Sequence, residues 1–594
     1  MHRAHSFEGV LVPTQALEGV LLFDGLEPDE LAAAASVMRF RSFEPGEMIC
    51  REGHPGDSMF VIIDGLVHLL ASLAHEPEVR TRSIFDAGRL VGKLRSGDVV
   101  GTGALITGQP RSATAEAAVA TDLLELGRDD FRALVGRFPR MLENLTGILT
   151  RRLAEVTSRH AHAGRRGEAV AVVGGASLEG GVPDVVAAAA SASPHSVESL
   201  DARGSLAGAL ARLDPMLREH RTVVIVSAVD DELPQLLRHV DRTVALIGDQ
   251  GEADRFGPVA ADHGVKGQPV EAVLANGVKL PSSAGDSVRV VHVLSGDAEG
   301  SLSQADAAWL GRHVARTKLG LALGAGGAKG YAHLGALYAL EEAGYRIDCV
   351  SGSSIGAIVG TWIALGLSAG EIEEAMRATF TPEVVAETLK ISLGGAGSGH
   401  GRMVELLRDL TSGRTFEDTV IPLAIMTADL TLREPAPLRH GPLDEALIGA
   451  TALAGVFPPH ELGGHRLVDG LAIDPVPTSA VIEDGADVTV SINLIPRETL
   501  EAWPGHQPPA AQELRRRRPG MLDTLLEVMD LAQLDTSERN AALADVVVTP
   551  RFGPGSWRDF ELADLFMAAG REATEKQLPA LRSLARPQFA GVIN

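Results

Sequence analysis

Two short apolar segments between residues 319 and 356 are each followed by a glycine-rich turn and a helix-forming segment, and this repeated unit constrains the fold most strongly. The first segment, Leu319 to Leu323, leads into a loop from Gly324 to Lys329 and a helix expected to end near Gly344. The second segment ends at Val350 and leads into another turn. Strands that alternate with helices in this way predict an α/β domain.

The second turn, Gly352-Ser353-Ser354-Ile355-Gly356, fits the pattern G-x-S-x-G. Between a strand and a helix this pattern marks a nucleophile elbow, a sharp turn that lifts a serine hydroxyl clear of the sheet. Ser354 is therefore the candidate nucleophile, and Gly352 and Gly356 are the elbow glycines. A single match is weak evidence in a chain with 65 glycines, so the interpretation depends on the neighbouring motifs.

The first turn is the candidate oxyanion hole. Acyl transfer needs hydrogen-bond donors for the oxyanion, and consecutive backbone N–H groups in a glycine-rich loop at a helix N-terminus supply them. The donors expected here are Gly326, Gly327, Ala328 and Lys329. A phosphate-binding loop is the alternative, but the spacing fails G-x-G-x-x-G and there is no G-K-[ST] of a Walker A loop.

A third element, Asp469-Gly470, follows a short apolar run about a hundred residues downstream. The order of glycine-rich loop, G-x-S-x-G and D-G resembles the patatin-like phospholipases over about residues 319–581. This resemblance implies a catalytic dyad of Ser354 and Asp469 without histidine. It also implies an oxyanion loop at Gly324 to Gly330, with the basic residue of that loop at Lys329.

The chain departs from the family pattern at two positions near the aspartate. Leu471 stands where Gly or Ala is usual, and Asp474 stands where asparagine is frequent. A Ser-His-Asp triad that uses His460 or His465 is a competing arrangement, since both histidines lie close to Asp469 in the sequence.

The mechanism expected from these residues is two-step acyl transfer by a serine lipid acyl hydrolase, a phospholipase or lysophospholipase. Asp469 accepts the proton of Ser354, the loop amides hold the oxyanion, and water then releases the fatty acid. An aspartate with an ordinary pKa is a weak base at neutral pH, so close placement or desolvation must assist it. No metal or other cofactor is expected. The alternative is a catalytically weak, signal-responsive binding or scaffold protein.

The first organised segment contains short strands between residues 43 and 70, separated by turn signals, and a helical stretch from 129 to 159. This pattern predicts a small antiparallel barrel with helices. The string EPGEMICREGHPGDSMFVIIDGLVHLL and the later GDVVGTGALITGQPRSATAEA resemble a cyclic-nucleotide-binding domain. The resemblance places a candidate cyclic-nucleotide phosphate site at Gly101, Thr102, Arg111 and Ser112.

The planar guanidinium of Arg111 suits a phosphate, with helix N–H groups opposite it. Thr102 stands where the family has an acidic residue for the ribose 2′-hydroxyl, and a hydroxyl accepts such a bond more weakly than a carboxylate. Three interpretations stay open: a regulatory or oligomerisation module without nucleotide, a weak cyclic-nucleotide site, and a site for another ligand.

Residues 168–300 alternate between apolar β-branched runs and helical stretches, which predicts a parallel α/β sheet. Strands are expected at residues 169–173, 222–226, 243–247 and 288–294, and helices at 184–190 and 235–240. The loop from Gly174 to Ser177 has no lysine, so a working phosphate loop is not expected. A comparable linking region occurs in the bacterial relatives of neuropathy target esterase, which this domain order resembles, and we expect a non-catalytic coupling domain.

With 594 residues the chain is too long for one core. The expected fold class is multidomain, with a tail at 1–20, a β-barrel with helices at 21–162, the α/β coupling domain at 168–300 and an α/β hydrolase domain at 317–590. The net charge of −24 argues against a nucleic-acid polymer as partner. The expected partner is the phospholipid or lysophospholipid substrate, and a homo-oligomer is left open.

The expected location is the cytoplasm, with peripheral contact at the inner membrane face. Cysteine is limited to Cys50 and Cys349, which suits a reducing compartment. There is no signal peptide pattern at the N-terminus and no run of about 18 apolar residues. The basic run Arg515 to Arg518 is a candidate for contact with lipid headgroups, and a solvated loop is the alternative.

Overall fold

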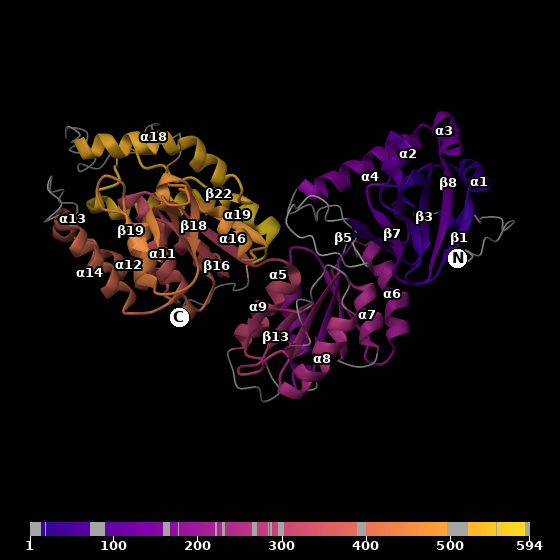
Figure 1. Ribbon diagram of the computed structural model, residues 1–594, viewed down its shortest axis with the longest axis horizontal. Coiled ribbons are helices and arrows are strands. Elements are labelled where there is room, and N and C mark those ends of the chain that lie inside the picture. The colour runs from indigo at the N-terminus through magenta and orange to yellow at the C-terminus, as the bar shows by residue number, and fades with distance from the viewer. Residues whose placement is uncertain are drawn as a thin grey trace. The chain divides into compact units, whose positions relative to one another are not determined.

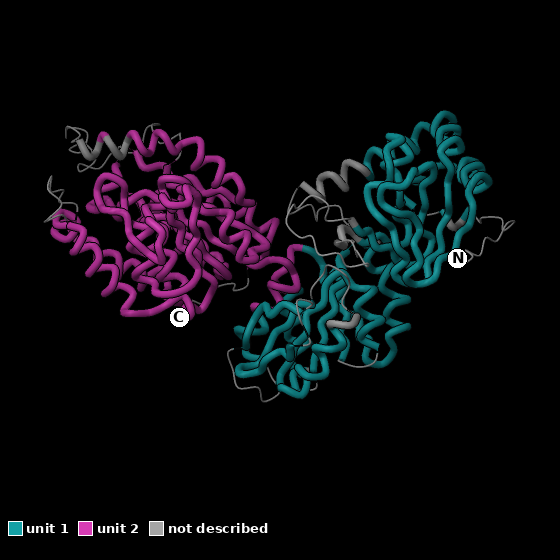
Figure 2. The backbone as a smooth tube through the Cα atoms, in the orientation of Figure 1, with its two compact units in different colours: residues 1–190, 195–308 teal, residues 191–194, 309–594 magenta. Residues whose placement is uncertain are grey.

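The computed structural model divides into two compact units, residues 1–190 with 195–308 and residues 191–194 with 309–594 (Figure 2). The described residues are 14–17, 20–71, 89–157, 167–175, 177–219, 222–228, 232–263, 270–282, 284, 288–294, 302–388, 399–495, 521–553 and 555–587. Most of the expected tail at 1–20, and all of the basic run Arg515 to Arg518, lie outside them. The division after residue 308 falls between residue 300, where the coupling domain is expected to end, and residue 317, where the hydrolase domain is expected to begin.

Unit 1 begins with two four-stranded antiparallel sheets, in the orders β1-β8-β3-β6 and β2-β7-β4-β5. Their strands are β1 Arg39–Phe43, β2 Met48–Cys50, β3 Ser58–Asp64, β4 Leu66–Ala71, β5 Arg89–Arg95, β6 Val99–Val100, β7 Thr114–Ala117 and β8 Thr121–Gly127. Side chains of a strand alternate between its two faces. On β3, Phe60 and Ile62 pack between the sheets, whereas Met59 and Val61 pack against the helices.

Four α-helices accompany these sheets, α1 Pro28–Ser36, α2 Thr102–Thr107, α3 Arg128–Arg137 and α4 Arg140–Thr157. The helical stretch expected from 129 to 159 is thus two helices. The break falls at Pro139, because the residue before a proline is disfavoured in the helical conformation. Phe138 accordingly has φ −125° and ψ 79°.

The rest of unit 1 is a six-stranded parallel sheet in the order β10-β11-β9-β12-β13-β14. Its strands are β9 Ala169–Gly174, β10 Val197–Asp201, β11 Thr222–Ala228, β12 Arg242–Ile247, β13 Val270–Leu274 and β14 Val288–Val293, and its helices are α5 Val182–Ala192, α6 Leu206–Arg218, α7 Leu233–His239 and α8 Gln250–His263. The four expected strands are present. The edge strand β10, VESLD, is missing from the prediction because only one of its five residues is buried.

Unit 2 contains one mixed sheet in the order β19-β20-β17-β16-β15-β21-β22, with β18 paired to β17. Its strands are β15 Leu319–Leu323, β16 Cys349–Ser353, β17 Leu423–Asp429, β18 Glu434–Leu438, β19 His460–Leu462, β20 His465–Asp469, β21 Val488–Ile492 and β22 Val546–Val548. The five neighbouring strands β17-β16-β15-β21-β22 are parallel to one another. Strands β18, β19 and β20 run antiparallel to their neighbours.

Helices cover both faces of this sheet (Figure 1). The α-helices of unit 2 are α10 Tyr331–Glu342, α11 Ile355–Ala364, α12 Ala369–Thr379, α13 Pro382–Thr388, α14 His400–Thr411, α15 Leu443–Ala450, α16 Thr478–Glu483, α18 Met521–Ala541 and α19 Ala563–Leu584, and α9 Gln304–Ala315 spans the boundary between the units in the sequence. On β15, Leu321 joins the large core under α10 and α11, whereas Ala322 packs with Val481 of α16.

Several local features of unit 2 can be recognised in the sequence. Helix α10, which follows the glycine-rich loop and is expected to end near Gly344, ends at Glu342, and Gly344 has φ 85°. Ser368 and Glu371 form the capping box that starts α12. The apolar run Val420 to Met426 predicts a strand, and β17 begins three residues into that run, at Leu423, since Pro422 before it has no N–H to donate. None of the helices in the described part of the chain combines the length and apolar character needed to cross a membrane.

Candidate active site

The turn between β16 and α11 holds Ser354 in a conformation that few non-glycine residues adopt, with φ 55° and ψ −122°. Its flanking glycines are required by space. A Cβ on Gly352 would lie 2.2 Å from the carbonyl oxygen of Gly356, and a Cβ on Gly356 would lie 2.2 Å from that of Leu323. The strand, the turn and the helix can therefore approach one another only with glycine at both positions, as in a nucleophile elbow.

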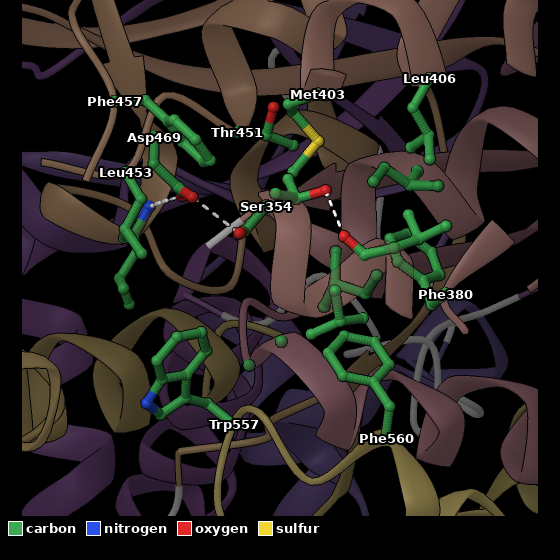
Figure 3. Close-up of a pocket in the computed structure, with 18 of the residues that line it drawn as sticks. Ser354, Phe380, Met403, Leu406, Thr451, Leu453, Phe457, Asp469, Trp557 and Phe560 are labelled. Atoms are coloured by element: carbon green, nitrogen blue, oxygen red, sulfur yellow. Dashed lines mark hydrogen bonds between the residues drawn. The ribbon is translucent and has the colours of Figure 1, made fainter. Parts of the chain in front are cut away.

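Asp469 lies next to Ser354 although 115 residues separate them in the chain. The hydroxyl Oγ of Ser354 donates a hydrogen bond of 2.7 Å to the carboxylate Oδ2 of Asp469 (Figure 3). The sheet brings them together, because Asp469 ends β20, which pairs with β17, and β17 pairs with β16. The backbone N–H of Leu471 donates to Oδ1 of Asp469 at 2.9 Å, so both carboxylate oxygens are held.

The carboxylate of Asp469 is buried, with 3% of the residue exposed. Burial raises the pKa of Asp469 to about 6, and the hydrogen bonds from Ser354 and from the Leu471 amide oppose that rise. A carboxylate with this pKa is a better proton acceptor near neutral pH than an ordinary aspartate.

The two histidines of the competing triad are engaged elsewhere. His460 Nε2 lies 2.8 Å from a carboxylate oxygen of Glu445, and His465 Nδ1 lies 2.6 Å from one of Asp429. His465 starts the strand that Asp469 ends, so about 13 Å of extended chain separates the two positions. The geometry pairs Ser354 directly with the aspartate and places neither histidine between them.

The glycine-rich loop after β15 is held by backbone hydrogen bonds. The N–H groups of Gly324 and Ala325 donate to Ile492 and Pro475. Of the four amides expected to face an oxyanion, Ala328 donates to the Trp557 carbonyl at 2.5 Å and Lys329 donates to that of Gly326 at 3.2 Å. These last two N–H groups are engaged in this structure.

Of the four loop residues, Gly326 and Gly327 line the same pocket as Ser354. Gly327 has φ 57°, and a Cβ there would lie 2.3 Å from the Trp557 carbonyl oxygen. Beneath the loop, His333 Nε2 donates to the Gly324 carbonyl at 2.8 Å. Burial lowers the pKa of His333 to about 4, so the ring is neutral and its proton is on Nε2.

The side chain of Lys329 lies against an aromatic ring. Its Nζ is 5.5 Å from the centroid of Phe552. Burial lowers the pKa of Lys329, and the carboxylates of Asp530 and Asp559 oppose that shift.

An apolar pocket of about 120 Å³ opens beside the serine. Figure 3 shows Asp469 on one side of it and Leu406 and Phe380 on the other, with Ser354 between them. Its walls are Gly326, Gly327, Ser354, Ile355, Ile358, Phe380, Val384, Val385, Thr388, Met403, Leu406, Thr451, Leu453, Phe457, Asp469, Leu471, Asp530, Trp557 and Phe560. A pocket lined by aliphatic and aromatic side chains suits a hydrocarbon chain.

The departures near Asp469 fit the structure. Leu471 packs with Ala325 and Ile495, which ties the aspartate loop to the glycine-rich loop. Asp474 accepts a hydrogen bond of 2.6 Å from Asn540 of α18. Burial raises the pKa of Asp474 to about 6.

In unit 1 the residues of the candidate phosphate site partly converge. Thr102 is buried at the start of α2, and Ser112 is exposed. The guanidinium of Arg111 is buried and donates to the carbonyl oxygens of Gly101 at 3.1 Å and Ser58 at 2.7 Å. A cyclic phosphate would therefore compete with two carbonyl groups for this side chain.

The loop after β9 is occupied by a carboxylate of the same chain. Glu252, at the start of α8, accepts hydrogen bonds from the N–H and hydroxyl of Ser177 and from the N–H of Gly248, at 2.8 to 2.9 Å. A Cβ on Gly175 would lie 2.1 Å from the same carboxylate. This arrangement disfavours an anionic ligand at that loop. Among the residues that the structure describes, no group of three or more His, Cys, Asp and Glu could hold a metal ion.

Several lining residues were not predicted from the sequence. Trp557 lies about 200 residues beyond the elbow. Its main-chain carbonyl accepts the bond from Ala328, and a main-chain contact of this kind leaves no motif in the sequence. Phe380, Met403 and Leu406 come from helices whose apolar positions resemble ordinary core positions in the sequence.

Comparison with protein families gives two matches. Residues 321–482 match the model of the patatin-like phospholipases, and residues 40–138 match that of the cyclic nucleotide-binding domain. Both resemblances drawn from the sequence are thereby confirmed, together with the multidomain fold class. The C-terminal match is to the domain of a lipid-hydrolysing enzyme.

Three individual proteins are similar to parts or the whole of this chain. An uncharacterised NTE family protein of Mycobacterium tuberculosis is 24% identical over 605 residues, which cover 96% of this chain and 97% of that protein. The lysophospholipase NTE1 of Mycosarcoma maydis is 34% identical over 230 residues, which cover 33% of this chain and 11% of that protein. Among solved structures, the catabolite activator protein of Thermus thermophilus is 28% identical with a TM-score of 0.21, covering 28% of this chain and 68% of that chain.

Proposed function

The chain carries a patatin-like phospholipase domain and an N-terminal cyclic nucleotide-binding domain, and we propose that it is a serine acyl hydrolase of phospholipids or lysophospholipids. The observation that carries the proposal is the hydrogen bond of 2.7 Å between Ser354 and Asp469 at the side of an apolar pocket. The pocket accepts the acyl chain, and the dyad cleaves its ester.

In the first step, Oγ of Ser354 attacks the ester carbonyl carbon while its proton passes to Asp469. The carbonyl oxygen becomes an oxyanion that accepts hydrogen bonds from the amides of Gly326 and Gly327. When the tetrahedral intermediate collapses, the ester C–O bond breaks and the leaving alcohol takes the proton from Asp469. The product of this step is an acyl-enzyme on Ser354.

In the second step, a water molecule attacks the acyl carbon and gives its proton to Asp469. Collapse breaks the bond between the acyl carbon and Oγ of Ser354, which recovers the proton, and the fatty acid leaves. The raised pKa of Asp469 supports this role, because a group that accepts and returns a proton works best with a pKa near the working pH.

The N-terminal domain is proposed to regulate this activity, with a cyclic nucleotide as the candidate ligand. In the structure Arg111 bonds to two neutral carbonyl groups, so binding of the phosphate must exchange these bonds for stronger ones to an anion. A domain that serves assembly without nucleotide is the competing account. The enzyme is further proposed to act in the cytoplasm and to touch the inner membrane face peripherally.

The experiment that tests the function measures fatty-acid release from lysophosphatidylcholine and from a short-chain nitrophenyl ester. The wild type should hydrolyse at least one of them, and Ser354→Ala and Asp469→Asn should each lose roughly 10³-fold or more. Thermal unfolding of the variants shows whether they fold. A folded wild type that releases nothing from either substrate would favour a binding or scaffold role.

The same assay tests regulation when cyclic AMP or cyclic GMP is added. A nucleotide that changes the hydrolysis rate of the wild type should not change the rate of Arg111→Lys. The lysine ammonium cannot form the two parallel hydrogen bonds to a phosphate that a guanidinium forms. No response to either nucleotide would favour the assembly account.

A further inference from the structure

His333 is a buried histidine that the proposed reaction does not use. It lies in the first turn of α10, and 1% of the residue is exposed. Its ring is not among the side chains that line the pocket beside Ser354. Its Nε2 donates a hydrogen bond of 2.8 Å to the carbonyl oxygen of Gly324, nine residues earlier in the chain. The ring therefore bridges the two ends of the glycine-rich loop.

The ring of His333 directs all of its hydrogen bonding to this one contact. Its Nδ1 is buried and has no hydrogen-bond partner in the part of the chain that the structure describes. Burial lowers the pKa of His333 to about 4, so at neutral pH the ring carries one proton, on Nε2. A buried polar atom without a partner destabilises the folded state. A residue that served only packing would be apolar here, so the contribution of this histidine is its Nε2 contact.

The carbonyl of Gly324 is the point where the glycine-rich loop meets the helix after the nucleophile. A Cβ on Gly356, at the start of α11, would lie 2.9 Å from this carbonyl oxygen. The N–H of Gly324 donates at 3.0 Å to the carbonyl of Ile492, the last residue of β21. The position of Gly324 relative to α11 is thus set through its N–H, held by the sheet, and through its carbonyl, held by His333.

The amides of Gly326 and Gly327, which are proposed to receive the oxyanion, follow Gly324 by two and three residues. An oxyanion hole works by preorganisation, because donors that are already fixed where charge develops do not have to reorganise during the reaction. A misplacement of about 1 Å at the reacting atoms can cost roughly 10²-fold in rate. A contact that fixes one end of the loop therefore acts on the reaction through the loop amides.

We propose that His333 is a positioning residue for the oxyanion hole. Its Nε2–H holds the carbonyl of Gly324, and the loop that starts there then presents its amides at a fixed distance from Ser354. The inference rests on the proposed function, which makes Ser354 the nucleophile of an ester hydrolase. Loss of the donor should weaken binding of the transition state and leave binding of the substrate nearly unchanged.

The test compares variants of His333 in the full chain, with a soluble nitrophenyl ester as substrate. Leucine has no donor, so kcat of His333→Leu should fall by roughly 10²-fold, with KM within about threefold of wild type. The amide nitrogen of glutamine is as many bonds from Cα as Nε2 is, so His333→Gln should recover most of the lost kcat. Asparagine, whose amide nitrogen is one bond nearer to Cα, should not.

An alkyl trifluoromethyl ketone reports on the oxyanion hole directly. Oγ of Ser354 forms a bond to its carbonyl carbon, the electron pair of the carbonyl moves to the oxygen, and the serine proton passes to Asp469. The inhibition constant should rise in His333→Leu by the factor by which kcat/KM falls, because the adduct resembles the tetrahedral intermediate. A purely structural loss would lower the amount of folded enzyme and leave the inhibition constant of the remainder unchanged.

Tyr345→Phe is the matched control. The hydroxyl of Tyr345 is also buried and donates to a backbone carbonyl, that of Ala585 at 3.1 Å, but Tyr345 lies beyond the other end of α10. This variant should keep the wild-type kcat and inhibition constant, even if its unfolding temperature falls as far as that of His333→Leu. A loss of kcat equal to that of His333→Leu would overturn the positioning role.

Two other outcomes would overturn the positioning role and leave the proposed function standing. One is a folded His333→Leu with the kcat and inhibition constant of wild type, and the other is a His333→Gln as slow as His333→Leu. A folded wild type that hydrolyses no ester would refute the function itself, and the positioning role with it.

Discussion

Ser354 and Asp469 are joined by one hydrogen bond, and a different local structure positions each of them. The serine is held at a positive φ between a strand and a helix, and the aspartate ends an antiparallel strand and is fixed by the amide of Leu471. The Asp469 carboxylate cannot turn away without losing the bond from the Leu471 amide. The Ser354–Asp469 pair is therefore in place in the structure.

Activity should rise with pH through the pKa of Asp469. The carboxylate must be ionised to accept the Ser354 proton, and burial raises its pKa to about 6. The kcat/KM for a soluble ester should fall about tenfold per pH unit below that value and level off above it, because kcat/KM reports groups of the free enzyme. A midpoint near 4, the ordinary aspartate value, would contradict this account.

Replacement of His460 or His465 by alanine should preserve most of the activity. Each histidine pairs with a carboxylate other than that of Asp469. Steady-state hydrolysis of a nitrophenyl ester, compared with Ser354→Ala, is the measurement. A histidine variant as inactive as Ser354→Ala would establish a triad in place of the dyad.

Leu406→Trp should shift the enzyme toward shorter acyl chains. The added ring would fill the side of the pocket away from Asp469, so the ratio of kcat/KM for a C16 ester to that for a C4 ester should fall about tenfold or more. Glu405→Trp, which places the same ring on the exposed side of α14, should leave the ratio unchanged. An unaltered chain-length preference in Leu406→Trp would mean that the acyl chain lies elsewhere.

Gly327→Ala should lower kcat by about 10²-fold or more with little change in KM. The new methyl would meet the Trp557 carbonyl and displace the amides that are proposed to receive the oxyanion. Gly413→Ala is the control, since Gly413 also has a positive φ of 73° but no neighbour within 4 Å of its added Cβ. Equal losses in the two variants would point to general backbone strain.

Asp474→Asn should stabilise the protein at pH 8 and not at pH 4. The pKa of Asp474 is raised to about 6 by burial. Its contribution to stability is therefore fully present below about pH 4 and is lost as the pH rises through 6. Asparagine carries no charge, and a flip of the Asn540 amide lets the pair keep its hydrogen bond. Thermal unfolding should show a gain at pH 8 equivalent to roughly 1 to 3 kcal/mol; a gain of the same size at pH 4 would contradict the linkage.

The sequence predicted the parts of the site that are encoded locally. Strand β16, the elbow at Ser354 and the end of the strand at Asp469 follow from apolar runs and glycines within a few residues. The engagement of Ala328 was not predictable, because its partner Trp557 comes from a distant loop and bonds through the main chain. The pocket walls were missed for a related reason, since Met403 and Leu406 follow the helical spacing that core residues also follow.

The carboxylate of Glu252, a residue of the same chain, occupies the loop after β9. In a domain whose loop holds a free phosphate compound, stability varies with the concentration of that compound by mass action. An internal carboxylate is present at constant effective concentration, whatever the metabolic state of the cell. The N–H groups of Ser177 and Gly248 are thus satisfied without a ligand, and the structure of that loop does not depend on the supply of one.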